Sequence, residues 1–108
     1  MVNQPLEENV DVRKKTGGII LLECYFDGEG PLFIMEPVLR KLFRSFQSRI
    51  FHYRLKLTPE HPVAREFHLS DDINYLIYRD GNMMGLIRGM LPLHEFIARL
   101  EELLTSNH

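Results

Sequence analysis

The chain has 108 residues, a length that fits one domain built around one hydrophobic core. Its apolar fraction of 44% and charged fraction of 26% are ordinary for a globular protein, and its net charge of −2 favours neither nucleic acid nor acidic membranes. The single cysteine, Cys24, excludes an intramolecular disulfide and a four-cysteine zinc site. No apolar run reaches the ~18–20 residues that span a bilayer. We therefore expect no nucleic-acid partner, no membrane segment and a cytoplasmic location.

The N-terminal residues 1–16 are polar and charged, unlike a secretory signal. We treat them as a lead-in that belongs to the same domain as residues 17–108. A short helix is expected around Leu6–Lys15. The glycine pair Gly17-Gly18 then breaks it.

The first buried strand is predicted at Ile19–Tyr25, because the run IILLECY is almost continuously apolar between breakers. Residues 27–31 follow as a loop rich in glycine and proline. A helix is predicted over Leu32–Arg49, where apolar residues recur with the spacing of one buried stripe. Pro37 lies inside this helix and removes one of its hydrogen bonds.

The second strand is predicted at Ile50–Leu57 because its residues alternate in character. Phe51, Tyr53, Leu55 and Leu57 share one side, and His52, Arg54 and Lys56 share the other. A short helix is then expected within Pro59–Leu69, with its apolar residues turned inward.

The C-terminal third predicts a β-hairpin and a helix. Strands at Ile73–Arg79 and Asn82–Arg88 are separated by Asp80-Gly81, a pair that tolerates the positive φ angles of a tight turn. Pro92–Leu104 has the clearest helical pattern. With a βαβ unit before the hairpin, this order predicts an α/β fold: a mixed central sheet flanked by helices on both faces.

The element order and several local segments resemble thioredoxins. After the first buried strand, thioredoxins carry a Trp-Cys-Gly-Pro-Cys segment, then a proline inside the helix followed by two apolar residues. The matching segments here are Gly28-Glu29-Gly30-Pro31-Leu32, Pro37-Val38-Leu39 and, before the last helix, Gly89. The resemblance runs from Glu23 to Leu104 without a gap, and it implies a thioredoxin-like fold.

The departures from the thioredoxin pattern concern the redox site. Glu29 and Leu32 stand where the family has its two cysteines, and Ile73 stands where it has a cis-proline. A cis bond before a residue other than proline costs ~2.5–4 kcal/mol, so we expect a trans bond before Ile73. The resemblance therefore implies a divergent member without disulfide reductase activity.

The resemblance also implies roles for two further residues. Glu23 matches the buried acid that lies beneath the cysteines of thioredoxins, and Arg54 matches the basic residue on the neighbouring strand. We expect the two to form a partly buried ion pair. Cys24 lies in an apolar strand, so we interpret it as a small core residue and not as a reactive thiol.

The histidines have no metal-binding spacing, and we expect them to be solvated or to cap helices. No phosphate-cradling glycine loop is present, so we expect neither a metal nor a cofactor.

The loops at one end of the sheet are the candidate binding site, because the resemblance implies that they converge there. The candidate residues are Asp27, Glu29, Gly30, Pro31, Leu32, Asp71, Asp72, Ile73, Gly89 and Leu91. The carboxylates among them would favour a basic partner segment, around an apolar centre formed by Leu32, Ile73 and Leu91.

Three functions remain open from the sequence. The first is a redox-inactive binding or chaperone-like module for a protein partner. Bacterial hydrogenase operons encode accessory proteins of this kind, and the segment from Gly89 to Glu95 is similar to theirs. A phosducin-like or other thioredoxin-fold scaffold is equally open. The second is an enzyme that uses Cys24 alone or the loop carboxylates as acid and base. The third is a structural subunit of a larger assembly.

Overall fold

The computed structural model describes residues 3–5, 18–26, 28–46, 48–70 and 72–105. The elements in chain order are β1 (Asn3–Pro5), β2 (Ile19–Tyr25), α1 (Gly30–Ser45), β3 (Ile50–Lys56), α2 (Pro62–Glu66), β4 (Ile73–Arg79), β5 (Asn82–Arg88) and α3 (Leu93–Thr105). The predicted order is confirmed from β2 onward. The helix expected around Leu6–Lys15 lies outside the described residues.

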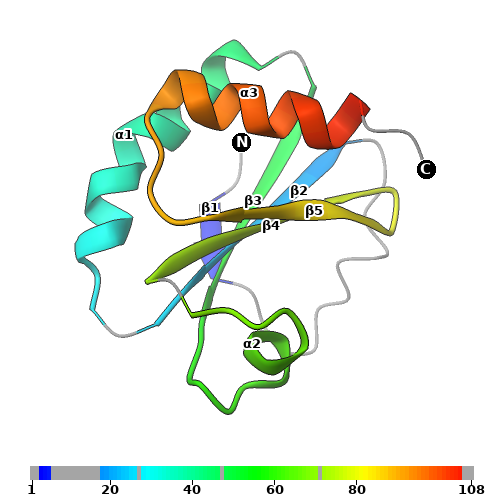
Figure 1. Cartoon of the computed structure of the whole chain (residues 1–108). Helices are drawn as coiled ribbons and strands as arrows, with labels where there is room; N and C mark the ends of the chain where they lie inside the picture. Colours follow the sequence, from blue (N-terminus) through cyan, green and yellow to red (C-terminus); the bar gives the residue numbers. More distant parts are fainter. Residues whose placement is uncertain (1–2, 6–17, 27, 47, 71, 106–108) are drawn as a thin grey trace.

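The strands form one mixed sheet in the order β1-β3-β2-β4-β5 (Figure 1). β2 lies at its centre, parallel to β3 on one side and antiparallel to β4 on the other. β1 is a three-residue edge strand parallel to β3. β4 and β5 form the predicted hairpin, with φ angles of 49° at Asp80 and 83° at Gly81. Those positive angles explain why this dipeptide occupies the turn.

The helices are divided between the two faces of the sheet. In Figure 1, α1 and α3 lie on one side of the strands and α2 lies on the other. The alternation of side chains along β2 supplies both cores: Ile19 and Leu21 pack beneath α1 and α3, while Ile20, Leu22 and Cys24 pack on the α2 side. The continuous apolar run of β2 therefore reflects burial on both faces, as expected.

Helix α1 begins two residues earlier and ends four residues earlier than predicted. Its start includes Pro31, whose fixed φ angle suits the first turn of a helix. Its end is set by Phe46, which has extended angles of φ −77° and ψ 136°. The buried stripe is formed by Leu32, Met35, Leu39 and Leu42.

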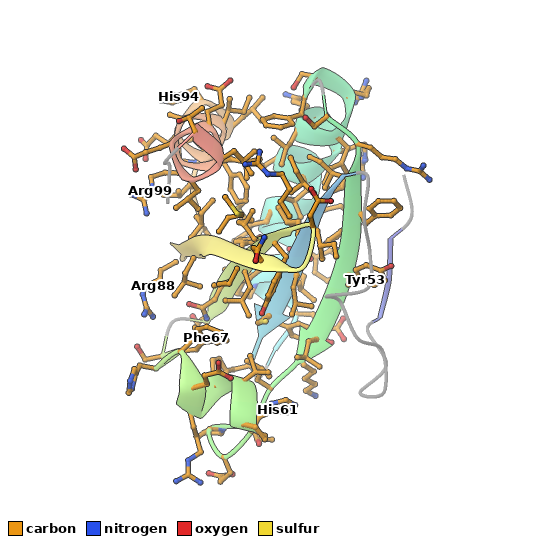
Figure 2. All side chains as sticks on the ribbon, turned by 90° about the vertical axis from the view of Figure 1, so that its right-hand side faces the viewer. Tyr53, His61, Phe67, Arg88, His94 and Arg99 are labelled. Atoms are coloured by element: carbon orange, nitrogen blue, oxygen red, sulfur yellow. The ribbon has the colours of Figure 1, made fainter. Side chains whose placement is uncertain are left out.

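The short helix α2 is fixed at both ends by side chains. His61 Nδ1 accepts a hydrogen bond of 3.1 Å from the N–H of Val63, which is the capping role expected for a histidine. At the other end, Arg88 of β5 donates to the carbonyl oxygens of Phe67 and His68, each at 3.2 Å. Figure 2 shows Arg88 above Phe67, with His61 farther along α2.

Among the helices that the structure describes, none has the length and apolar content required to cross a membrane.

Candidate functional site

The centre of the sheet carries one acidic side chain, Glu23 of β2. In the register of the strands, Glu23 lies opposite Arg54 of β3 and opposite Tyr75 of β4. Directly opposed residues of a sheet project to the same face, so all three side chains meet beneath α1. The sheet register therefore builds a polar cluster from three strands.

The carboxylate of Glu23 is fully buried and accepts three hydrogen bonds. Nε of Arg54 donates to Oε1 at 2.8 Å, and Nε2 of His52 lies 2.9 Å from the same oxygen. The hydroxyl of Tyr75 donates to Oε2 at 2.9 Å. The Arg54 side chain is 25% exposed, so the expected partly buried ion pair is confirmed. We call these four residues the Glu23 cluster.

His52 and Tyr75 are the members of the Glu23 cluster that sequence reasoning missed. The expectation that His52 is solvated or a cap is wrong: its side chain is buried and packs against Phe43 of α1, with ring centroids 5.3 Å apart. His52 lies two residues before Arg54 on β3, so the two side chains project to the same face of the sheet. Helix α1 covers that face. The alternation of β3 predicts which residues share a face, but the burial of that face depends on the packing of α1 over it, which the alternation does not show.

The charge state of Glu23 follows from opposing effects. Burial disfavours the carboxylate, but the hydrogen bonds from His52, Arg54 and Tyr75 outweigh it, so the pKa of Glu23 is lowered from its ordinary value of 4.5. Tyr75 responds in the opposite direction: burial and the neighbouring Glu23 charge raise the pKa of its hydroxyl. The cluster therefore holds an ionised carboxylate and a neutral phenol at physiological pH.

Cys24 is buried on the opposite face of β2, within the core beside α2. Burial, assisted by the charge of Glu23, raises the pKa of its thiol to about 12. Thiolate is the reactive form of cysteine, so this side chain lacks both the access and the ionisation that thiol chemistry needs. The interpretation of Cys24 as a core residue is confirmed.

The two positions that match the thioredoxin cysteines lie at the start of α1. Glu29 is the exposed residue that precedes the helix, and its side chain makes no capping hydrogen bond. Leu32 is buried in the core beneath the helix. A small pocket of about 70 Å³ opens beside them, lined by Glu29, Leu32, Phe33, Glu36 and Arg54.

The loops expected to converge at this end of the sheet are joined by backbone hydrogen bonds. The N–H of Gly89 donates to the carbonyl of Ile73 at 2.9 Å, and the N–H of Phe26 donates to the carbonyl of Asp72 at 3.2 Å. Asp72 is exposed, whereas Asp27 and Asp71 lie outside the described residues. The peptide bond before Ile73 is trans, as expected.

The apolar centre expected on this surface is corrected by the burial of its members. Ile73 and Leu32 are both core residues, and Leu91 packs partly buried against the same core. The side chain of Ile73 is buried in the core, which explains why an apolar residue follows two aspartates. In the part of the chain that the structure describes, the exposed large apolar side chains are instead Phe33, Ile34 and Met90.

Metal binding has no support in the described ranges, where no three side chains of histidine, cysteine, aspartate or glutamate are grouped to hold an ion.

The arrangement defines an α/β protein of thioredoxin-like fold that has one buried cysteine and no CxxC pair. Solved structures share this fold. The thioredoxin pre-protein of Schistosoma mansoni has a TM-score of 0.66 and 11% identity, covering 94% of this chain and 94% of that one. Thioredoxin-2 of the malaria parasite has a TM-score of 0.61 and 15% identity, covering 79% and 82% of the two chains.

Sequence comparison also leads to thioredoxins. Thioredoxin AMT13 of Alternaria alternata is 25% identical over 89 residues, which are 82% of this chain and 75% of that protein. Chloroplastic thioredoxin Y2 of Arabidopsis thaliana is 19% identical over 91 residues, 84% of this chain but only 54% of that protein. No family model matches the chain. The chain is thus a distant homologue of thioredoxins.

Proposed function

We propose that this protein is a redox-inactive, thioredoxin-like binding module that holds a protein partner. The partner docks at the end of the molecule formed by the first turn of α1, Asp72 and the segment Gly89–Leu91. This role needs no thiol, metal or cofactor.

The absence of dithiol chemistry is supported by the sequence. Disulfide reduction by a thioredoxin passes through a mixed disulfide that a second cysteine resolves, and this chain has one cysteine. Cys24 is also buried in the core, with the pKa of its thiol raised to about 12. The same burial disfavours an enzyme that works with a single thiol.

The observation that carries the binding role is the exposure of large apolar side chains at this end of the molecule. Phe33 is 70% exposed, Ile34 59% and Met90 46%. The segment from Gly89 to Pro92 passes beside α1 in Figure 1, and Leu91 packs against the same core as Leu32. Phe33 and Ile34 are consecutive on α1, and adjacent exposed apolar side chains are typical of interaction surfaces.

Acid-base catalysis by the loop carboxylates is less well supported. The pocket beside Glu29 has a volume of about 70 Å³, whereas sites for small molecules usually occupy ~300–1,000 Å³. The surface fits a protein side chain better than a substrate enclosed for chemistry. A structural subunit differs from a binding module only in the permanence of its complex.

A chaperone-like role is the finer form of this proposal. The segment from Gly89 to Glu95 is similar to that of accessory proteins encoded in bacterial hydrogenase operons, which are thought to chaperone an exported subunit. Under this proposal the protein binds its partner in the cytoplasm and releases it unchanged.

The test combines capture with an activity assay. The tagged protein is used to capture partners from an extract of its native cells, beside a Phe33→Ser, Ile34→Ser double variant and an Arg99→Ser control on α3. Figure 2 shows Arg99 projecting from α3. We expect one partner set, retained by the control and lost by the double variant. Catalysis of disulfide reduction at the rate of a true thioredoxin, or equal capture by all three proteins, would refute the proposal.

A further inference from the structure

The first turn of α1 presents two consecutive apolar side chains to solvent, Phe33 and Ile34, which we call the α1 ridge. The fold does not need them there, because the buried stripe of the helix is supplied by Leu32, Met35 and residues farther along. An exposed apolar pair next to the candidate site is therefore available to a partner.

Phe33 also forms one wall of the small pocket beside the ridge, together with Glu29, Glu36 and Arg54. Its volume of about 70 Å³ is well below the ~300–1,000 Å³ of small-molecule sites. This is space for the head group of one side chain. The pocket lies between the start of α1 and strand β3.

The charges around this pocket are balanced except at one residue. Arg54 is engaged by buried Glu23 at 2.8 Å, and Glu36 pairs with Arg40 one turn along the helix at 3.2 Å. Glu29 is exposed and makes no ion pair within the described part of the chain. Among the described residues, the pocket thus carries one unpaired carboxylate beside an aromatic ring, a combination that attracts a cation.

We infer that the partner presents a short segment in which a lysine or arginine lies next to apolar residues. The basic head group enters the pocket, pairs with Glu29 and contacts the ring of Phe33. The neighbouring apolar residues cover Ile34. This inference rests on the proposed function and names the chemistry of the partner.

A protein segment fits these observations better than an anionic membrane does. A membrane surface would require a cluster of exposed cations around the ridge, but the pocket beside it is lined by two exposed carboxylates, Glu29 and Glu36. The cation that lines this pocket, Arg54, is already paired with Glu23, and the net charge of the chain is −2. Exposed Asp72, at the same end of the sheet, adds a further negative charge.

The test begins with an unbiased probe, a phage-displayed library of random peptides selected on the intact protein. We expect the enriched peptides to share a lysine or arginine within two residues of apolar side chains. A synthetic peptide of the enriched sequence is then titrated by fluorescence anisotropy. Glu29→Gln should weaken its binding about tenfold and reduce the dependence on salt, and Phe33→Ser should weaken it at least as much.

The matched control is Glu95→Gln, which removes an exposed carboxylate from the first turn of α3. It should leave binding unchanged, and circular dichroism should show that every variant stays folded. Glu29→Gln suits this test because the Glu29 side chain caps nothing in the helix.

The outcomes separate this inference from the proposed function. Enrichment of acidic or purely apolar peptides, or equal binding by the Glu29→Gln and Glu95→Gln variants, overturns the basic-segment inference while the binding role stands. Binding of vesicles with 30% phosphatidylserine in place of peptides overturns it as well. If neither peptides nor native partners bind, both proposals fail.

Discussion

The carboxylate of Glu23 and the guanidinium of Arg54 lie opposite each other on neighbouring parallel strands, with 2.8 Å between Oε1 and Nε. Glu23 is fully buried, while Arg54 reaches the wall of the pocket beside the α1 ridge. One ion pair thus connects the centre of the sheet with the candidate binding surface.

Removal of the Arg54 side chain should destabilise the fold, because the buried carboxylate of Glu23 depends on this partner. Arg54→Ala leaves a buried carboxylate with only His52 and Tyr75 as donors, so we expect a loss of about 2–3 kcal/mol in the free energy of unfolding. In a Glu23→Gln background the same substitution should cost much less. Urea unfolding of the four proteins in this double-mutant cycle measures the coupling.

The control for this cycle is the pair of Arg99 with Glu102 on α3, where the two side chains are exposed and 3.5 Å apart. Arg99→Ala should cost less than about 1 kcal/mol, because solvent screens surface pairs. Additive effects of the Glu23 and Arg54 substitutions would show that the contact contributes nothing to stability.

Acid should weaken the fold through Glu23. The pKa of Glu23 is lowered in the folded state, so on acidification the unfolded chain binds a proton near the ordinary value of 4.5 while the folded protein does not. Stability contributed by the carboxylate is therefore complete above that pH and is lost as the pH falls below 4.5 toward the folded pKa.

The measurement for this pH dependence is urea unfolding between pH 7 and pH 3 for the natural protein and for Glu23→Gln. We expect the natural protein to lose more stability over the acidic part of this range. Because the other carboxylates are common to both proteins, the difference isolates Glu23. Parallel curves for the two proteins would mean that the pKa of Glu23 is not lowered by folding.

The thiol of Cys24 should be inert in the folded protein. Its pKa of about 12 and its burial predict no reaction with Ellman's reagent at pH 8 within minutes. In 6 M guanidinium chloride one thiol per chain should react at once. Rapid labelling of the folded protein would restore the single-thiol enzyme as a candidate.

Much of the fold was predictable because local patterns and burial agree. The hairpin strands Ile73–Arg79 and Asn82–Arg88 were predicted with their observed bounds, since Asp80-Gly81 fixes the turn between them. The pairing then shifts at an irregularity between Ile77 and Tyr78 that the turn does not determine. The end of α1 was not predicted correctly. The apolar spacing continues to Phe46, although the backbone is already extended at that residue.

The candidate site was predicted less completely, for reasons that depend on which faces the helices cover. The Glu23 and Arg54 pair followed from the resemblance, but the burial of His52 depends on α1 lying over its side of β3. Ile73 was expected on the binding surface because the resemblance matches it to the cis-proline beside the redox site, but as the first residue of β4 it is buried in the core. The local sequence predicts that β4 begins at Ile73, but it does not show that α1 and α3 cover the face to which Ile73 projects.

Gly85, in the middle of β5, should resist even the smallest side chain. A Cβ atom at this position would meet Cδ2 of Leu103 most closely, and would lie 2.9 Å from its Cδ1 and 3.0 Å from its Cγ; Leu103 is a residue of α3 that packs against the core. The backbone of Gly85 does not have a positive φ angle, so alanine is compatible with its conformation and would otherwise stabilise the strand slightly. The contact with Leu103 opposes that gain, and because the end of this partly buried side chain can shift, we expect Gly85→Ala to cost only about 1 kcal/mol through overpacking.

A second substitution identifies Leu103 as the cause. Leu103→Ala removes the atoms that Cβ would meet, so Gly85→Ala should be neutral or stabilising when it is introduced into that background. Thermal and urea unfolding of the two single variants and the double variant give the interaction free energy. A Gly85→Ala penalty of equal size in both backgrounds would show that β5 needs its glycine for a reason other than the packing of α3.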